Sequence, residues 1–361
     1  MNTLQFISPI AAFLVTYLLI PVLRKVAIRV HLVDKPNQRK IHSQAVPLVG
    51  GISIFMATAL VMGLSFPFES YMLINLNVIV ATTILLLMGV IDDRFDLRAS
   101  LKLAIQLILA HYVFTQGIKI ESLYGVFGIY ELALWVQYLL TIIVITGVVN
   151  AFNLMDGIDG LAAGLAILGF SVLATLALFL EQYVLALVFA TLIGSLLAFL
   201  QFNLSKNHKI FMGDAGSLTL GFVTVVSGIY LIQSATGSSK SSLVTLSVIA
   251  IMLVPVLDAL RVFRKRAKSG KSPFDADRTH LHHLILNIGL KHNMTVLSIM
   301  AIITLVMFTG YLGFNFFGFT FSIVTLLLVF YLISSILQFH NQLIKWKNRI
   351  LAMEKNGKQS Y

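Results

Sequence analysis

The sequence contains no cysteine and few charged residues, and both shortages narrow what the protein can be. Without cysteine there is no disulfide and no thiol chemistry, although this does not decide the compartment. Charged residues make up 11% of the 361 residues, whereas a soluble domain carries about 25%. No hydrophilic stretch of domain size is present either. With 58% hydrophobic residues and a mean hydropathy of +0.91, the composition is that of a polytopic membrane protein with an all-α helical bundle.

Apolar runs of about 20 residues, the length that crosses a bilayer, predict about eleven transmembrane helices. They lie near 4–23, 47–66, 72–91, 103–117, 132–149, 161–180, 184–204, 217–233, 242–260, 294–314 and 319–338. We therefore expect one transmembrane catalytic domain over 1–338 and a basic cytoplasmic tail over 339–361. The first cation is Arg24, so the first run is more typical of a spanning helix than of a cleaved signal.

The basic residues are distributed unevenly between the connections. If 24–46 is placed inside, 24 of the 26 Lys and Arg fall on that side, and only Lys119 and Lys240 on the other. The positive-inside rule then predicts an external N-terminus and a cytoplasmic C-terminus. All ten Asp lie within or at the edge of inner segments. Because Asp is a short carboxylate suited to metal ions and tight turns, we expect the active site on the cytoplasmic face.

Two adjacent carboxylates, Asp92 and Asp93, follow the third run, and Lys102 lies about three turns further along. Adjacent carboxylates repel each other unless a cation lies between them. The pair therefore predicts a Mg²⁺ or phosphate site, which Lys102 could reach as a point charge. The structural alternative is a solvated helix start at which Asp offsets the helix dipole.

A polar pattern follows the fifth run and recurs at every third residue: Asn150, Asn153, Asp156 and Asp159. If this segment is helical, the four side chains form one stripe at a membrane edge, where polar groups are costly to bury. Gly157 and Gly160 break the turn and allow a ligand to approach the backbone. They also leave Asp159 placed to cap a helix from Leu161. Capping explains one of the four residues, so the pattern favours a binding site.

One carboxylate, Asp214, stands between Gly213 and Gly216 just before the eighth run. There it could hold a hard cation while the N–H groups of the helix start face a phosphate. A helix cap is the structural alternative. Phe211 just before it is more typical of a core residue than of a platform for a base.

Three His in four residues close the largest inner connection: His280, His282 and His283. Zinc is disfavoured because the chain has no Cys and no matching motif elsewhere. Hydrogen-bond donors to a phosphate or a sugar fit better, and a solvated connection without function is the alternative.

In this order, and on this many helices, the motifs resemble the polyprenyl-phosphate N-acetylhexosamine 1-phosphate transferases. The resemblance covers about 33–284 and rests on 34–37, 47–51, 92–93, 150–161, 211–217 and 277–283. Leu281 interrupts the His run, and Asp96 and Arg98 follow the Asp pair, as in the bacterial WecA branch of this superfamily.

The resemblance implies transfer of GlcNAc 1-phosphate from UDP-GlcNAc to undecaprenyl phosphate, with release of UMP and with Mg²⁺ or Mn²⁺ as cofactor. It implies a bacterial inner-membrane enzyme with a periplasmic N-terminus, acting at the first membrane step of O-antigen and enterobacterial common antigen synthesis. The implied partners are the two substrates, the bilayer and, as an option, a second copy in a homodimer, but no nucleic acid.

The resemblance also implies roles for individual residues. The metal ligands would be Asp214 and Asn153, and the catalytic carboxylates beside the acceptor phosphate would be Asp92 and Asp93. The substrate-binding residues would be Lys102 at a phosphate, Gly157, Asp159 and Phe211 at the uracil, Asn150 and Asp156 in the same polar pattern, and Arg266, His280, His282 and His283 at the sugar phosphate.

Two other classes stay open at this point. A UbiA-like prenyltransferase also binds a diphosphate through Mg²⁺ on Asp-rich loops, but its motif spacings fit poorly. A secondary transporter would place ionisable groups near the bilayer midplane. Here the acids gather at inner edges, and Asp258, the nearest to an intramembrane acid, falls at the end of its run.

Overall fold

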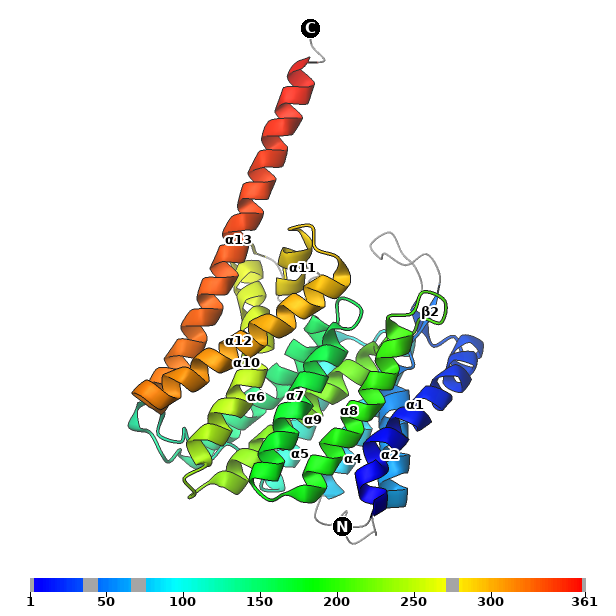
Figure 1. Ribbon diagram of the computed structural model, residues 1–361, viewed down its shortest axis with the longest axis vertical. Helices are drawn as coiled ribbons and strands as arrows, with labels where there is room; N and C mark the ends of the chain where they lie inside the picture. Colours follow the sequence, from blue (N-terminus) through cyan, green and yellow to red (C-terminus); the bar gives the residue numbers. More distant parts are fainter. Residues whose placement is uncertain (1–2, 35–44, 66–75, 271–278, 359–361) are drawn as a thin grey trace. The chain divides into compact units, whose positions relative to one another are not determined.

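The chain folds almost entirely as α-helices (Figure 1). The computed structural model describes residues 3–34, 45–65, 76–270 and 279–358. Within these ranges, nine helices are long and apolar enough to cross a membrane. Two shorter apolar helices, α2 (Gly50–Ser65) and α5 (Ala99–Thr115), match the second and fourth predicted runs. The predicted polytopic helical membrane fold is confirmed.

The chain divides into two compact units, Met1–Val256 and Leu257–Tyr361. The first holds α1 (Thr3–Arg29), α2, α4 (Leu76–Phe95), α5, the 3-10 turn η1 (Val126–Gly128), α6 (Leu134–Met155), α7 (Leu161–Phe179), α8 (Tyr183–Asn203), α9 (Gly213–Ala235) and the start of α10 (Ser241–Lys268). The second holds the rest of α10, then α11 (Leu281–Leu286), α12 (His292–Phe317) and α13 (Phe319–Lys358). Two short strands, β1 (Val33–Asp34) and β2 (Val46–Pro47), pair antiparallel in the first unit.

Helix α9 forms the core of the first unit. Between its two ends its residues are mostly apolar or small, and 18 of its 23 residues are buried, as expected for a helix without a polar face. Helices α2, α4, α6 and α7 pack against it. Figure 1 shows α7 and α8 side by side in green in this unit. Because α9 begins at Gly213, the core helix places its first turn, with Asp214, among the ends of its neighbours.

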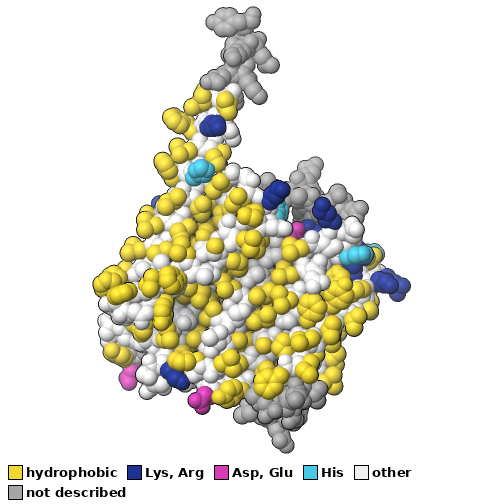
Figure 2. Space-filling model, in the orientation of Figure 1, with side chains coloured by type: hydrophobic (Ala, Val, Ile, Leu, Met, Phe, Trp, Pro, Cys, Tyr) yellow, Lys and Arg dark blue, Asp and Glu magenta, His cyan; other side chains and the backbone are white. Residues whose placement is uncertain are grey.

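Large hydrophobic side chains are exposed along the outer helices, including Leu18 of α1, Leu64 of α2, Ile108 of α5 and Leu328 of α13. Figure 2 shows such side chains spread over the visible helix faces, with few charged groups among them. Apolar surface of this extent would be unfavourable in water, so these faces are suited to lipid.

Several helices extend beyond their predicted apolar runs, and α10 and α13 extend furthest. Helix α10 continues past residue 260 to Lys268, and α13 continues through the basic tail to Lys358. Hydropathy marks where a chain leaves the apolar layer, but Lys, Arg, Gln and Glu are good helix formers. The polar composition therefore does not end either helix.

Candidate active site

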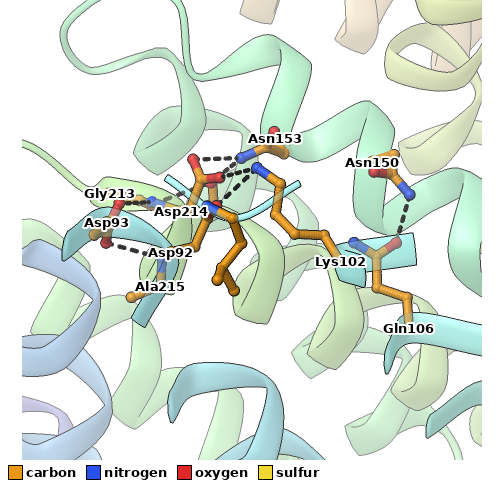
Figure 3. Close-up of polar contacts among 11 residues, drawn as sticks. Asp92, Asp93, Lys102, Gln106, Asn150, Asn153, Gly213, Asp214 and Ala215 are labelled. Atoms are coloured by element: carbon orange, nitrogen blue, oxygen red, sulfur yellow. Dashed lines mark hydrogen bonds and ion pairs between the residues drawn. The ribbon is translucent and has the colours of Figure 1, made fainter. Parts of the chain in front are cut away.

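Four helices of the first unit bring charged and amide side chains to one place (Figure 3). Helices α4 and α6 contribute their last turns, and α5 and α9 their first. The residues that meet there are Asp92, Asp93, Lys102, Asn153 and Asp214. Three acidic segments that are far apart in the sequence therefore converge.

Lys102 lies between two carboxylates of this cluster. Its Nζ donates to Asp92 Oδ2 at 2.7 Å and to Asp214 Oδ2 at 3.1 Å. The other oxygen of Asp92 accepts the Leu97 N–H at 2.8 Å. Two carboxylates that share one lysine are close enough to repel each other, and here the ammonium of Lys102 neutralises that repulsion.

Asp214 is more accessible to a ligand than Asp92. Its side chain is 31% exposed, whereas that of Asp92 is 4% exposed. Asn153 fixes its orientation, because Asn153 Nδ2 donates to Asp214 Oδ1 at 3.0 Å and to Ser217 Oγ at 2.9 Å. Asp214 is thus held by the Asn153 amide at Oδ1 and by the Lys102 ammonium at Oδ2.

Asp93 caps the start of α9 from another helix. Its Oδ1 accepts the Asp214 N–H at 2.7 Å and its Oδ2 accepts the Ala215 N–H at 3.2 Å. Gly213 has φ +74°, and a Cβ there would overlap the Asp93 carboxylate. We expected the N–H groups at this helix start to face a phosphate. That is wrong for these two groups, because a carboxylate 121 residues earlier already takes them.

The segment 47–51 positions the start of α9 from its other side. Phe211 N–H donates to Pro47 O at 2.9 Å, Gly50 N–H to Phe211 O at 3.0 Å, and Gly51 N–H to Met212 O at 2.9 Å. A Cβ at Gly51 would overlap the backbone of Gly216. The two adjacent glycines therefore let this segment lie directly against the backbone that precedes and begins α9.

The polar pattern after the fifth run is only partly helical. Helix α6 ends at Met155, so Asn150 and Asn153 lie on the helix and Asp156 and Asp159 lie in the turn that follows. The condition for a single stripe, a helix through all four residues, is therefore not met. Asn150 Nδ2 donates to Gln106 Oε1 at 2.5 Å and to Thr146 O at 2.8 Å, which leaves it beside the cluster rather than in it (Figure 3).

Asp159 binds a lysine instead of capping α7. The cap position is Gly160, in a left-handed conformation, and no side chain caps the helix. Lys209 Nζ donates to Asp159 Oδ2 at 2.6 Å and lies 5.2 Å from the centre of the Phe211 ring. The expected capping role is wrong because this ion pair takes the carboxylate. Asp159 and Phe211 nevertheless meet, joined by Lys209.

Asp156 lies in the same turn as the exposed Gly157. Burial raises the pKa of the Asp156 carboxyl to about 7, and the negative charges of Asp214 and Asp159 add to the rise. The part of the chain that the structure describes supplies no hydrogen bond to this side chain. A cation at this position would favour its ionised form.

The predicted His residues and Arg266 belong to the second unit. Asp258, which is fully buried, accepts hydrogen bonds from His280 Nδ1 at 2.9 Å and from Arg261 Nη2 at 2.6 Å. It also accepts the Leu281 N–H. We expected Asp258 at the end of a helix. That is wrong because α10 runs to Lys268, and the acid is a paired, interior group.

His282 is buried next to the other two His rings. Its ring centre lies 5.8 Å from that of His280 and 4.2 Å from that of His283. Burial, together with the neighbouring His rings, lowers the pKa of His282 to about 3. At neutral pH this ring is therefore uncharged. Arg266, also buried, lies with its guanidinium 5.8 Å from the Phe263 ring centre.

The first-unit cluster fits a hard divalent cation. Among the described residues, no three His, Cys, Asp or Glu side chains form a ready metal cage. Mg²⁺ needs none, since it commonly takes one or two carboxylates together with substrate phosphates and water. Asp92 and Asp214 supply such oxygens, and the Lys102 ammonium between them shows that their geometry accommodates a positive charge.

Three partners of the predicted residues did not emerge from the sequence: Gln106, Lys209 and Arg261. Asp258 was noted only as an acid near the end of its run, not as the partner of His280. Lys209 lies two residues before Phe211, but the polar segment before it also contains Lys206, so the sequence alone does not single out Lys209. Gln106 gave a weak signal, as an amide one turn after Lys102 inside a mostly apolar run.

Comparison with known proteins identifies relatives over most of the chain. Residues 75–232 match the model of glycosyl transferase family 4. The undecaprenyl-phosphate α-N-acetylglucosaminyl 1-phosphate transferases of Salmonella typhi and Escherichia coli K12 are each 34% identical over 286 residues, which are 78% of this chain and 76% of the relative. A probable undecaprenyl-phosphate N-acetylglucosaminyl 1-phosphate transferase of Bacillus subtilis is 35% identical over 307 residues, 82% of this chain and 83% of the relative.

Proposed function

Since the chain belongs to glycosyl transferase family 4, together with the undecaprenyl-phosphate N-acetylglucosaminyl 1-phosphate transferases, we propose that it moves GlcNAc 1-phosphate from UDP-GlcNAc to undecaprenyl phosphate. UMP would be the second product. The observation that carries the proposal is the Asp92–Lys102–Asp214 cluster, because a reaction between two phosphate groups requires positive charge held next to hard oxygen ligands.

In the proposed reaction, a phosphate oxygen of the lipid acceptor forms a bond to the β-phosphorus of UDP-GlcNAc while the bond from that phosphorus to the bridging oxygen breaks. The electron pair leaves with UMP. The second pKa of a phosphate monoester is about 6, so the acceptor is already an anion and needs little base. The difficulty is the approach of two anions, which Lys102 would ease as a fixed cation.

Mg²⁺ or Mn²⁺, when bound, would neutralise the diphosphate and stabilise the leaving UMP. Asp214 is the proposed ligand because its side chain is partly exposed, whereas Asp92 is buried and both oxygens of Asp93 accept backbone N–H groups. Asn153 stands beside it and orients it through Nδ2. Neither role depends on a third carboxylate, which is consistent with a metal ion that is completed by substrate oxygens.

Between the two adjacent carboxylates, Asp92 is the better candidate for a role at the acceptor, and it would act by holding Lys102, because its own side chain is only 4% exposed. Both oxygens of Asp93 already accept N–H groups at the start of α9, whereas Asp92 shares Lys102 with Asp214. We favour direct attack by the acceptor over an aspartyl-phosphate intermediate. Positional isotope scrambling in UDP-GlcNAc, measured with UMP present and without acceptor, would support the covalent route and contradict ours.

The uridine end is proposed to bind at the turn after α6. Asp159 and Phe211 offer a hydrogen-bond acceptor and an aromatic face, and Lys209 lies next to both. Gly157, exposed in the same turn, leaves the backbone accessible to a base. We propose that this face is cytoplasmic in a bacterial inner membrane, as the distribution of basic residues predicts.

The donor sugar is tested directly with membranes that carry the protein and undecaprenyl phosphate. UDP-GlcNAc, UDP-GalNAc and UDP-MurNAc-pentapeptide are supplied separately and UMP release is measured. We expect release with UDP-GlcNAc and a lipid-linked product that retains GlcNAc, as the first step of O-antigen and enterobacterial common antigen synthesis requires. Preference for another donor would leave the reaction type intact but overturn the proposed substrate.

A further inference from the structure

Helix α13 carries two stripes on opposite faces. The inner stripe is buried and packs within the second unit; it includes Leu326, Phe330, Ser334 and Asn341, and Asn341 Nδ2 donates to Leu284 O of α11 at 2.9 Å. The outer stripe is exposed between 38% and 66% and is here called the seam. It consists of Ile336, Phe339, Leu343, Trp346, Ile350 and Met353.

The seam has the spacing of a coiled coil. Its members alternate by three and four residues, which places Ile336, Leu343 and Ile350 at one heptad position and Phe339, Trp346 and Met353 at the other. Val329 and Leu332 extend the pattern backwards. The inner stripe becomes polar after the half-buried Ile344, with Asn348 one turn on, whereas the seam stays apolar to Met353. The apolar seam therefore continues beyond the part of α13 that packs inside the second unit.

A bilayer cannot cover the whole seam. The apolar helix 319–351 has 33 residues, which at 1.5 Å each is about 50 Å, whereas the hydrocarbon layer is about 30 Å thick. Polar residues gather in the later part, including His340, Gln342, Lys345 and Arg349, so this is the part that leaves the membrane. From residue 338 to Met353 the helix rises about 22 Å, well beyond a headgroup layer of about 6 Å. The later seam thus lies in water, where a row of exposed large apolar side chains is unfavourable.

We infer that the seam pairs with the seam of a second copy of this chain in a parallel two-stranded coiled coil. A membrane gives both copies the same orientation, so their α13 helices run in the same direction and the same residues meet across a two-fold axis. Anchoring in one membrane also raises the effective concentration of the two helices.

The charges beside the seam agree with this occupant. Lys347 takes a heptad position beside the seam, and the position that faces it in the other chain holds the neutral Gln342. Lys345 lies away from the seam. These two lysines can therefore come together with the second copy without placing like charges opposite each other. This inference is independent of the proposed reaction.

The natural absence of cysteine allows a clean test with the full-length chain in its membrane. Single variants Leu343→Cys, Trp346→Cys and Ile350→Cys are oxidised and run on a non-reducing gel. Leu351→Cys is the matched control, because Leu351 is exposed and apolar but lies off the seam. We expect a disulfide-linked dimer at the seam positions in at least about fivefold higher yield than at 351, where only collisions contribute.

A second variant tests the seam without relying on one site. Leu343→Asp and Ile350→Asp in the Trp346→Cys background should reduce the dimer yield to that of the control, while an unchanged thermal unfolding midpoint shows that the chain still folds. Equal yields at residues 346 and 351, or no dimer at any seam position, would overturn the inference. Quenching of Trp346 fluorescence by brominated lipid without crosslinking would overturn it in favour of a membrane-bound seam.

Discussion

At the scale of single residues, Lys102 compensates the negative charges of Asp92 and Asp214. Asp92 is almost fully buried and its Oδ2 has the Lys102 ammonium as partner. Removing one partner of such a pair leaves a buried charge without compensation, which costs about 3–5 kcal/mol. A solvent-exposed pair contributes much less, about 0–1 kcal/mol.

We therefore expect Lys102→Met to lower the free energy of unfolding by about 3 kcal/mol in detergent, because Asp92 is left unpaired. Lys119→Met is the matched control, since Lys119 forms a longer, more exposed pair with Glu121 at 3.5 Å. Its effect should stay below about 1 kcal/mol. Equal losses in the two variants, measured by denaturant unfolding, would show that Lys102 does not compensate Asp92.

His282 gives the second unit a dependence on pH. Its folded pKa of about 3 lies below the ordinary value of 6.5, so between these values the unfolded ring binds a proton that the folded ring does not. The free energy of unfolding is therefore highest, as far as His282 determines it, above about pH 6.5, and it declines as the pH falls towards 3. We expect wild-type stability to fall relative to His282→Phe by up to about 1.4 kcal/mol per pH unit over this range.

Thermal unfolding midpoints between pH 7 and pH 4 check this prediction. The exposed His340→Phe variant is the control and should follow the wild type. If the unfolding midpoint of His282→Phe changes with pH as that of the wild type does, the burial of a neutral imidazole does not determine the loss of stability in acid.

At the scale of elements, close helix contacts hold the first turn of α9 against α4. Gly89 of α4 faces Ala215 of α9, and a Cβ at Gly89 would overlap the Ala215 backbone. Backbone cannot move aside as a flexible side chain can, so added volume here must separate the helices. The separation would also loosen the contacts from Asp93 to the N–H groups of Asp214 and Ala215.

Gly89→Ala should therefore destabilise the protein by about 1–3 kcal/mol and lower transferase activity, because overpacking displaces the Asp214 turn. Gly147→Ala in α6 is the control, because nothing lies within 4 Å of a Cβ built there. That change should stabilise the helix by about 0.5–1 kcal/mol. If Gly89→Ala has the same free energy of unfolding and the same transferase activity as the wild type, this contact does not hold α4 and α9 together.

The helices themselves were largely predictable, whereas the contacts between them were not. Long apolar runs indicated each span, since few other structures satisfy such a sequence. The ends of α10 and α13 were missed because helix propensity continues where hydropathy stops. The hydrogen-bond partners of Asp93 and Asp159 were missed because they lie 121 and 50 residues away, and no local pattern reveals such pairs.

At the scale of the whole molecule, a buried central helix delivers an exposed carboxylate to the edge of an apolar bundle. Helix α9 is surrounded by α2, α4, α6 and α7, and its first turn is fixed by Asp93 and by the segment 47–51. The convergence of Asp92, Asn153 and Asp214 was predicted as a set, because acids at membrane edges are seldom accidental. Their individual partners required the structure.

The most direct test of the central claim is the metal dependence of UMP release from UDP-GlcNAc and undecaprenyl phosphate by the purified full-length protein. We predict that release requires Mg²⁺ or Mn²⁺, stops with a chelator, and falls by at least about 10²-fold in Asp214→Asn, while Glu121→Gln, an acid outside the cluster, behaves as the wild type. Unchanged release in the presence of the chelator, or full activity of Asp214→Asn at saturating metal, would contradict the account.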